Sequence, residues 1–391
     1  MKFTAKIASL LVLAAAVLVS CGEKATPSGG SAVNLPDLAI SFDKNIIQND
    51  GTDAVTLKAY YKNEDVSDKA TFYRVIPDKM VPEVLSSRIF TSTTVGSYKF
   101  KVGYMGTYSD EITVSVTSKT LPSAVADPQP DNASFAHRTF FNQHTGSRCQ
   151  FCPGMTKLLN ETLVGDIKDK VVLAAIRGGN YGEGGFPNIK SPGTWPYLDI
   201  DYVDSYPYDK SVSGLTEKIL QRTAEPAAVG ISANPIYYAD TKQIMVRVSV
   251  KAAVKGEYHV GLWLMQDNYH ANQLDGLGIT VSDKSYDYNK HHNCVRLAES
   301  NYLGYNYIGY PLGTLDVGEK GEWVFLFDIK DAIEKSKSKG GWWESFSNEK
   351  LNDLHFAAFV TTPVNTPKGV KYEVVNAIDF PYNTPAPFDY K

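Results

Sequence analysis

The spacing of apolar residues changes twice along this chain of 391 residues, and these changes restrict the folds it can adopt. Between about residues 38 and 116, and again from residue 226 onward, apolar side chains recur at every second position. Between residues 138 and 223, apolar runs of strand length alternate with stretches at helical spacing. A period of two indicates strands with one buried face, and alternating strands and helices indicate an α/β unit. The sequence therefore predicts an α+β multidomain protein.

The first period-two segment predicts an immunoglobulin-like β-sandwich over residues 36–118. Alternating runs such as Val55–Tyr61 are separated by clusters of Gly, Asn, Asp and Pro, and Gly106 marks a hairpin turn between two runs. No catalytic set of residues is visible in this segment. We therefore expect it to act as a spacer or a binding module.

The middle segment predicts an α/β domain over residues 131–225. Arg138–Asn142 and Val171–Ile176 have the length and composition of strands, whereas Met155–Leu163 and Gly214–Thr223 carry apolar residues at helical spacing. Proline-rich sequence between Pro122 and Pro130, where neither period holds, separates this domain from the preceding one.

The last segment predicts a second β-sandwich over residues 226–391. Ile244–Val250 alternates with period two, and Trp323–Ile329 and His355–Val360 add apolar strands. One short helix is expected near Asp331–Lys337.

Residues 1–20 have the layout of an export signal. Lys2 and Lys6 precede the apolar run Ile7–Val19, which is too short to span a bilayer but suits the core of a signal peptide. The following Leu18-Val19-Ser20-Cys21 resembles the lipobox of bacterial lipoproteins. The alternative is an ordinary cleavage site that contains a cysteine. We expect cleavage before Cys21 and a lipid on that residue.

A lipid on Cys21 makes the membrane the first expected partner. Residues 21–35 are small and polar, which predicts a flexible tether. Gly22 stands where the commonest inner-membrane retention signal has aspartate, so the outer membrane is favoured, with the body at its periplasmic face or on the cell surface. No later stretch is long and apolar enough to cross a membrane.

Charge and glycine patterns argue against two partner classes. The net charge is −4, and no block of Lys and Arg interleaves with aromatic residues, so we expect no nucleic-acid partner. The glycine-rich stretch 178–185 lacks the Gly-Lys-Ser/Thr ending of a P-loop and the spacing of a dinucleotide fingerprint. We expect no nucleotide and no other cofactor.

The strongest chemical signal is Cys149-Gln150-Phe151-Cys152-Pro153, between a predicted strand and a predicted helix. The amide groups and dipole of a helix N-terminus favour a thiolate on the first cysteine, so Cys149 would attack and Cys152 would resolve. Arg148 and His144 are further candidates, although a surface arginine and a turn histidine are the commoner interpretations. A permanent disulfide that fixes a turn explains the same spacing, so the alternative of a structural pair stays open.

A thioredoxin-like redox site usually also has a cis-proline that faces the cysteines. Pro207, which lies before the last predicted helix, is the preferred candidate for this role, with Pro192 and Pro196 as competitors. The catalytic set expected from the sequence is therefore Cys149, Cys152 and Pro207.

A zinc site is the competing chemistry for the cysteine pair. Cys294 with His291 or His292 would have to complete a tetrahedral set, and nothing in the sequence places them near Cys149, so no metal is expected.

Phe140–Pro153 resembles the "strand, Thr-Gly, x-x-Cys-x-x-Cys-Pro" signature of the lipoprotein family related to a 28-kilodalton outer-membrane protein. Asn289–Arg296 is similar to that family's His-Asn-x-x-x-Arg region, and Val374–Ala377 resembles its closing strand. The resemblance covers roughly Ala133–Phe380. It implies a thioredoxin-like domain followed by a β-sandwich, carried on the outer membrane and often exposed at the surface.

Two functions are compatible with these features. In the first, Cys149 forms a mixed disulfide with an exported or surface protein and Cys152 releases it, which would make the protein a thiol–disulfide oxidoreductase. In the second, the protein is a non-enzymatic surface adhesin or assembly module, and the Cys149–Cys152 pair is structural. Burial of the cysteines is expected to discriminate between them.

Overall fold

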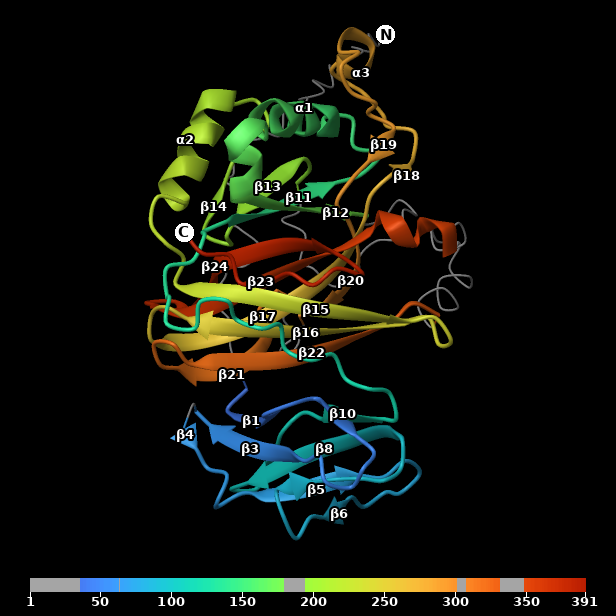
Figure 1. Cartoon of the computed structure of the whole chain (residues 1–391), viewed down its shortest axis with the longest axis vertical. Helices are drawn as coiled ribbons and strands as arrows, with labels where there is room; N and C mark the ends of the chain where they lie inside the picture. The colour runs from blue at the N-terminus through green and yellow to red at the C-terminus, as the bar shows by residue number, and fades with distance from the viewer. Residues whose placement is uncertain (1–35, 63, 179–193, 301–306, 331–347) are drawn as a thin grey trace, which may run out of the picture.

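The computed structural model describes residues 36–62, 64–178, 194–300, 307–330 and 348–391. Strands predominate in these residues and form several sheets (Figure 1), which confirms a β-rich protein. Several predicted features lie outside the described residues: the signal peptide at 1–20, Cys21, the tether at 21–35, most of the glycine-rich stretch 178–185, and the helix expected near Asp331–Lys337.

Two sheets face each other in the N-terminal part. One contains β1 (Leu38–Phe42), β3 (Val55–Tyr61), β4 (Glu64–Asp65) and β7 (Ile89–Phe90). The other contains β2 (Ile46–Gln48), β5 (Thr71–Val75), β6 (Glu83–Val84), β8 (Gly96–Tyr104), β9 (Thr107–Tyr108) and β10 (Ile112–Thr117). Leu57, Phe100 and Val114 are fully buried between them, as the period of two predicts. The immunoglobulin-like assignment stays a prediction.

A single sheet of nine strands extends from the middle of the chain to its C-terminal part. Its order is β14-β13-β11-β12-β20-β17-β23-β24, with β21 beside β17. The strands are β11 (Thr139–Thr145), β12 (Val171–Arg177), β13 (Tyr197–Ile200), β14 (Asp204–Ser205), β17 (Gly256–Gln266), β20 (Cys294–Glu299), β21 (Tyr310–Leu315), β23 (Leu354–Thr366) and β24 (Gly369–Pro381). β12 joins β20 through the pair Ala175 and Cys294. The sheet therefore crosses the boundary predicted between residues 225 and 226.

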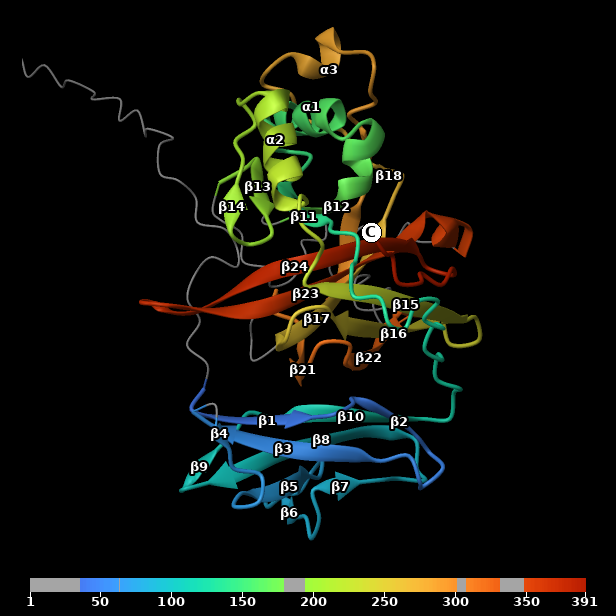
Figure 2. The ribbon, with the colours of Figure 1, turned by 60° about the vertical axis from the view of Figure 1, so that its left-hand side comes forward.

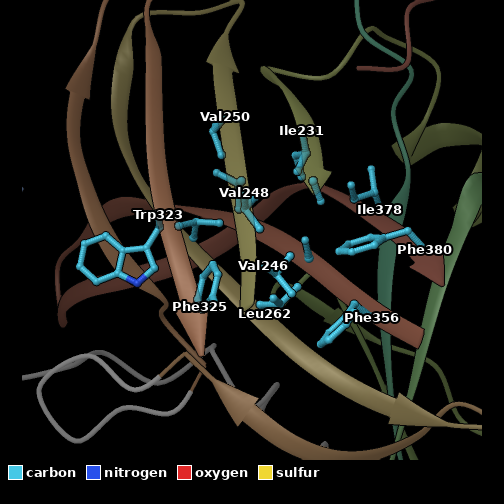
Figure 3. Packing of buried hydrophobic residues seen from close by; sticks show 14 of the residues in the cluster. Ile231, Val246, Val248, Val250, Leu262, Trp323, Phe325, Phe356, Ile378 and Phe380 are labelled. Carbon is cyan, nitrogen blue, oxygen red and sulfur yellow. The ribbon is translucent and has the colours of Figure 1, made fainter. Parts of the chain in front are cut away.

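One face of the β17–β23 region packs against a smaller antiparallel sheet. This sheet contains β15 (Val229–Tyr238), β16 (Gln243–Ala252) and β22 (Lys320–Asp328). Val246, Leu262 and Phe356 meet in the shared core (Figure 3). The strands predicted from the period of two thus form two layers here, and the assignment of a separate C-terminal β-sandwich domain stays a prediction.

The opposite face of the same region is also buried. Trp263 in β17 and Phe359 in β23 pack against Phe140 in β11, and the Phe140 and Phe359 rings stack with centroids 4.9 Å apart. Successive residues of a strand point to opposite faces, so Leu262 and Trp263 enter different cores. The α/β part is thus packed directly onto the C-terminal strands.

Helices cover the outer face of β11–β13 (Figures 1 and 2). They are α1 (Cys152–Thr162), α2 (Val212–Arg222) and the 3-10 helix η1 (Gly165–Lys170). Met155 and Leu215 are buried against Phe141, the strand residue next to Phe140 that points to the other face. The remaining short elements are β18 (Tyr269–His270), α3 (Ile279–Ser282), β19 (Lys290–His291) and the 3-10 helix η3 (Asn348–Asp353). In the described part of the chain, no helix is long and apolar enough to cross a membrane.

The N-terminal sheets contact the rest of the protein through aromatic and apolar side chains. Phe42 stacks on Trp323 with ring centroids 5.3 Å apart, and Trp323 stacks on Tyr310 at 4.9 Å. Ile46 is buried against Met245 of β16 beside this stack. This junction places the N-terminal sheets at the end of the molecule opposite to α1 and α3 (Figures 1 and 2).

The proline-rich connection is fixed by a buried ion pair. Lys251, whose side chain is 1% exposed, lies 3.1 Å from the Asp127 carboxylate and also donates to the backbone carbonyls of Pro130 and Asn132. Burial disfavours the Asp127 carboxylate, but donation from the Tyr390 hydroxyl and from nearby Lys side chains outweighs burial and holds its pKa far below the usual range. The segment that connects the first two predicted domains, which includes Asp127 and Pro130, is therefore held against β16.

Replacing Lys251 with methionine is expected to leave Asp127 buried with fewer partners. Loss of one member of a buried pair typically lowers the free energy of unfolding by about 3–5 kcal/mol. The urea midpoint of Lys251→Met would measure this loss. The control is Lys255→Met, which breaks the ion pair between Lys255 and Asp316. Both of these side chains are 67% exposed, so this substitution should leave the urea midpoint unchanged. Equal midpoints for both variants would contradict the structural role of Lys251.

Candidate functional site

The two predicted cysteines meet in a disulfide directly after β11. The Sγ atoms of Cys149 and Cys152 are 2.12 Å apart, and the Cα atoms 5.4 Å apart. The preceding residues form a tight turn in which the Cys149 N–H donates to the Gly146 carbonyl. The Cys152 N–H then donates to the Cys149 carbonyl, so one turn leads directly into α1.

The cysteines differ in exposure. Cys149 is half-buried, whereas Cys152 is only 1% exposed and is the first residue of α1. Pro153 follows in the first turn, where a missing N–H costs no helical hydrogen bond. The unpaired amides and dipole of α1 favour negative charge beside Cys149 once the pair is reduced. This asymmetry suits an attacking first cysteine and a resolving second one.

The cis-proline is Pro196, so the prediction of Pro207 was wrong. The cis bond joins Trp195 and Pro196, directly before β13. Tyr197 pairs with His144 of β11, and continuing this antiparallel register sets Pro196 opposite Thr145, close to the cysteine turn. Pro207 lies instead after β14, in the turn where its carbonyl accepts from the Lys210 N–H before α2 begins. The third candidate, Pro192, lies outside the described residues.

Trp195 and Tyr208 line the surroundings of the disulfide turn. A Cβ at Gly146 would lie 2.8 Å from the Trp195 ring, so only glycine permits this close approach. Tyr208 stacks with Phe151, which lies between the cysteines, and the two ring centroids are 6.3 Å apart. A Cβ at Gly154 of α1 would lie 2.7 Å from the Tyr208 ring. The turn is therefore packed between two aromatic side chains that follow it by more than forty residues.

A long excursion between β17 and β20, residues 267–293, reaches over the disulfide turn; we call it the arm. It contains β18, α3 and β19 and extends past α1 (Figures 1 and 2). The Leu274 N–H donates to the Ser147 carbonyl at 2.7 Å, and the Gly276 N–H donates to the Gln150 carbonyl at 2.7 Å. Two backbone hydrogen bonds thus fix the arm along the turn.

Gln273 of the arm adds a side-chain contact to the same turn. Its Nε2 lies 3.2 Å from the Gly146 carbonyl oxygen, 3.1 Å from that of Ser147 and 3.0 Å from that of Cys149. A fourth oxygen, from Leu274, lies at 3.0 Å. The carbonyl groups of the turn therefore converge on one amide.

The base of the arm is held by Asp267. Its carboxylate accepts the Asn293 N–H at 2.9 Å, which ties the two ends of the arm together, and it lies 3.4 Å from His292 and 3.5 Å from His355. His355 also contacts Asp379 at 2.9 Å. Burial alone would lower the pKa of His355, but contacts with the two carboxylates outweigh burial and raise the pKa to about 9.

This raised pKa predicts a pH-dependent stability. Because the folded state holds the His355 proton more tightly than the unfolded state, the contribution is complete below about pH 6.5 and is lost as the pH rises through about 9. We expect His355→Gln to remove up to about 3 kcal/mol of unfolding free energy at pH 6 and much less at pH 9.5. Urea unfolding at both pH values measures the difference. A constant difference between variant and wild type would contradict the prediction, and His270→Gln at an exposed position is the control.

The other residues singled out from the sequence lie in strands, in the turn or at the base of the arm. His144 is buried in β11 and burial lowers its pKa to about 4, so it is neutral near pH 7. Arg148 is exposed. His291 contacts the Ala271 carbonyl at 3.0 Å, and the Arg296 guanidinium lies 4.4 Å from the centre of the Tyr269 ring. His291 and Arg296 thus contact residues at the base of the arm.

The zinc alternative finds no support in the described residues. Cys149 and Cys152 are joined to each other, and Cys294 is buried in β20 beside Ala175. No group of three or more His, Cys, Asp or Glu side chains in the described ranges could hold a metal ion.

Sequence reasoning missed Gln273 and Trp195. Gln273 lies in a polar stretch without periodicity, more than 120 residues after the turn, and no local signal connects it to the cysteines. Trp195 precedes one of the three candidate prolines, but nothing in the sequence shows that it approaches Gly146.

Comparisons with known proteins give a fold likeness alone. No protein-family model matches the chain, and no curated protein matches it. Among solved structures, HBP35 of Porphyromonas gingivalis is similar, with a TM-score of 0.50 at 13% sequence identity over 66% of this chain and 78% of that chain. The resemblance to the 28-kilodalton family is therefore not confirmed by a family match.

Proposed function

We propose that this protein is an outer-membrane lipoprotein, held through Cys21, whose Cys149–Cys152 pair exchanges disulfides with exported proteins. The observation that carries the proposal is the asymmetric disulfide at the N-terminus of α1, with Cys149 half-buried and Cys152 buried. Reactive cysteines are partly exposed and lie in electropositive surroundings such as a helix N-terminus, whereas buried structural cysteines are inert.

The surrounding fold supports a thioredoxin-like assignment. The parallel strands β11 and β12 are joined by α1, and β13 and β14 pair antiparallel on the other side of β11 before α2. Pro196 has the cis bond expected of such a site, next to the strand that leads to Cys149. Both features agree with the domain that the family resemblance implies.

Apolar side chains around the turn support a polypeptide partner. Phe151, Leu274 and Leu277 are 38%, 54% and 40% exposed. Exposed apolar residues that gather at one place mark interaction surfaces. Incompletely folded exported proteins expose apolar segments together with their cysteines, so they fit this surface.

The exchange uses both cysteines in turn. The reduced Cys149 thiolate attacks a sulfur of a partner disulfide, which forms a mixed disulfide and releases one partner thiolate. Cys152 then loses its proton and attacks Sγ of Cys149, which frees the second partner thiolate and closes the Cys149–Cys152 disulfide. Two electrons pass from the pair to the partner, and a partner dithiol would reverse both steps.

The position of the site suits an anchored protein. The N-terminal sheets, which follow the expected tether, lie at one end of the molecule, and α1 and the arm lie at the other (Figures 1 and 2). The N-terminal sheets would then act as a spacer that holds the disulfide away from the lipid on Cys21.

The reduction potential of the pair tests the proposed exchange. We expect a value of about −120 to −270 mV, the range of working oxidoreductases, from thiol trapping of the mature chain across glutathione and dithiothreitol series. Cys294→Ser is the background, because it removes the remaining thiol. If the pair stays oxidised below about −300 mV, the disulfide is structural and the alternative of a non-enzymatic surface module holds.

Replacement of Cys21 tests the anchor separately. We expect Cys21→Ser to incorporate no radiolabelled fatty acid and to leave the membrane fraction, because serine lacks the thiol that the lipid would acylate or alkylate. Cys294→Ser should keep both the label and the membrane fraction. Retention of the label by Cys21→Ser would overturn the lipid assignment without affecting the redox proposal.

A further inference from the structure

We propose that Gln273 is a positioning residue for the Cys149–Cys152 pair, which sets how readily the disulfide closes. This inference rests on the proposed function, because the redox equilibrium of the pair matters only if the pair exchanges disulfides. It assigns to the arm a role that the sequence motif alone does not contain.

The first observation is the convergence of carbonyl groups on Gln273. Its amide has two hydrogens and faces the carbonyl oxygens of Gly146, Ser147 and Cys149 within 3.0–3.2 Å. These oxygens belong to one tight turn, so the hydrogens are shared among them. Such sharing requires the turn to keep its curvature.

The second observation is that the arm backbone binds the same turn. The N–H groups of Leu274 and Gly276 donate to the carbonyls of Ser147 and Gln150. Three arm residues, Gln273, Leu274 and Gly276, thus contact the segment from Gly146 to Gln150. The Asn293 N–H and the Asp267 carboxylate close the arm at its base.

The third observation is that Leu277, which follows this stretch and is 40% exposed, also approaches α1. The Leu277 side chain lies against Gly154 of α1, where a Cβ would meet it at 3.1 Å. Thr280 donates to Asp275 through both its N–H and its hydroxyl, which stiffens the arm beyond the turn. The arm that carries Gln273 is therefore itself held in place by these contacts.

This arrangement has a defined effect on the redox equilibrium. In the disulfide form, the covalent ring already restricts the turn. In the dithiol form, the hydrogen bonds from Gln273 to the carbonyl groups of the turn restrict the backbone of the turn. Less conformational entropy is therefore lost when the disulfide closes. Gln273 consequently stabilises the disulfide relative to the dithiol and lowers the reduction potential of the pair.

Substitution of Gln273 tests the inference in the full mature chain. Gln273→Met removes the donor and keeps side-chain length, and Gln273→Leu removes the donor with a side chain one atom shorter. We expect the equilibrium constant for oxidation of the pair by oxidised glutathione to fall about tenfold, because the freed dithiol turn then loses about one further residue's worth of backbone entropy when the disulfide closes. For a two-electron couple this equals a potential about 30 mV less negative. Gln221→Leu, at an exposed glutamine of α2, is the matched control and should leave the constant unchanged.

The outcomes separate this inference from the proposed function. A constant within twofold of wild type in a folded Gln273 variant overturns the positioning role, and the urea midpoint of the oxidised form establishes folding. Two variants are used because methionine adapts to the site if leucine disrupts it. A wild-type potential below about −300 mV would overturn the exchange proposal, whereas the ratio between variant and wild type would still decide the role of Gln273.

Discussion

The packing of Phe140 against Phe359 and Trp263 holds the two halves of this protein together. These side chains fill the space between β11–β12 and β17–β23, so both faces of the β17–β23 region are buried. Their burial joins the cysteine-bearing part to the C-terminal strands. Without it, β12 would be joined to β20 through little more than the pair Ala175 and Cys294. The orientation of β11, and with it the position of the disulfide turn, depends on this core.

The candidate site is assembled from both halves. The first half supplies the turn, α1 and the cis-proline, and the second half supplies the arm. The base of the arm at Asp267 follows β17 directly, and β17 is fixed by the core on each of its faces. Residues that look like a separate β-sandwich in the sequence therefore complete the surroundings of a Cys-x-x-Cys motif that precedes them by more than a hundred residues.

Local patterns predicted local structure well. The periods of two and the helical spacing located β3, β8, α1 and α2 closely, and the motif located the disulfide. These local patterns did not predict features that are determined by contacts between residues far apart in the sequence. Leu262 and Leu264 in β17 follow the period of two that indicates one buried face, but Trp263 and Met265 bury the other face against the α/β part. Three prolines satisfied the same local requirement for the cis position, and only the register of β13 on β11 singles out Pro196. The arm has no periodicity, so Gln273 carried no signal.

The separation between Gln273 and its acceptors affects the order in which the chain folds. Gln273 binds carbonyls that precede it by 124 to 127 residues, whereas the turn, α1 and the β11–β12 pair form from contacts close in sequence. Contacts of high sequence separation require closure of long loops and generally form late. The cysteines are therefore brought together by local structure first, and the arm docks afterwards. A chain that closes the disulfide before the arm docks does so without the contacts from Gln273 to the turn.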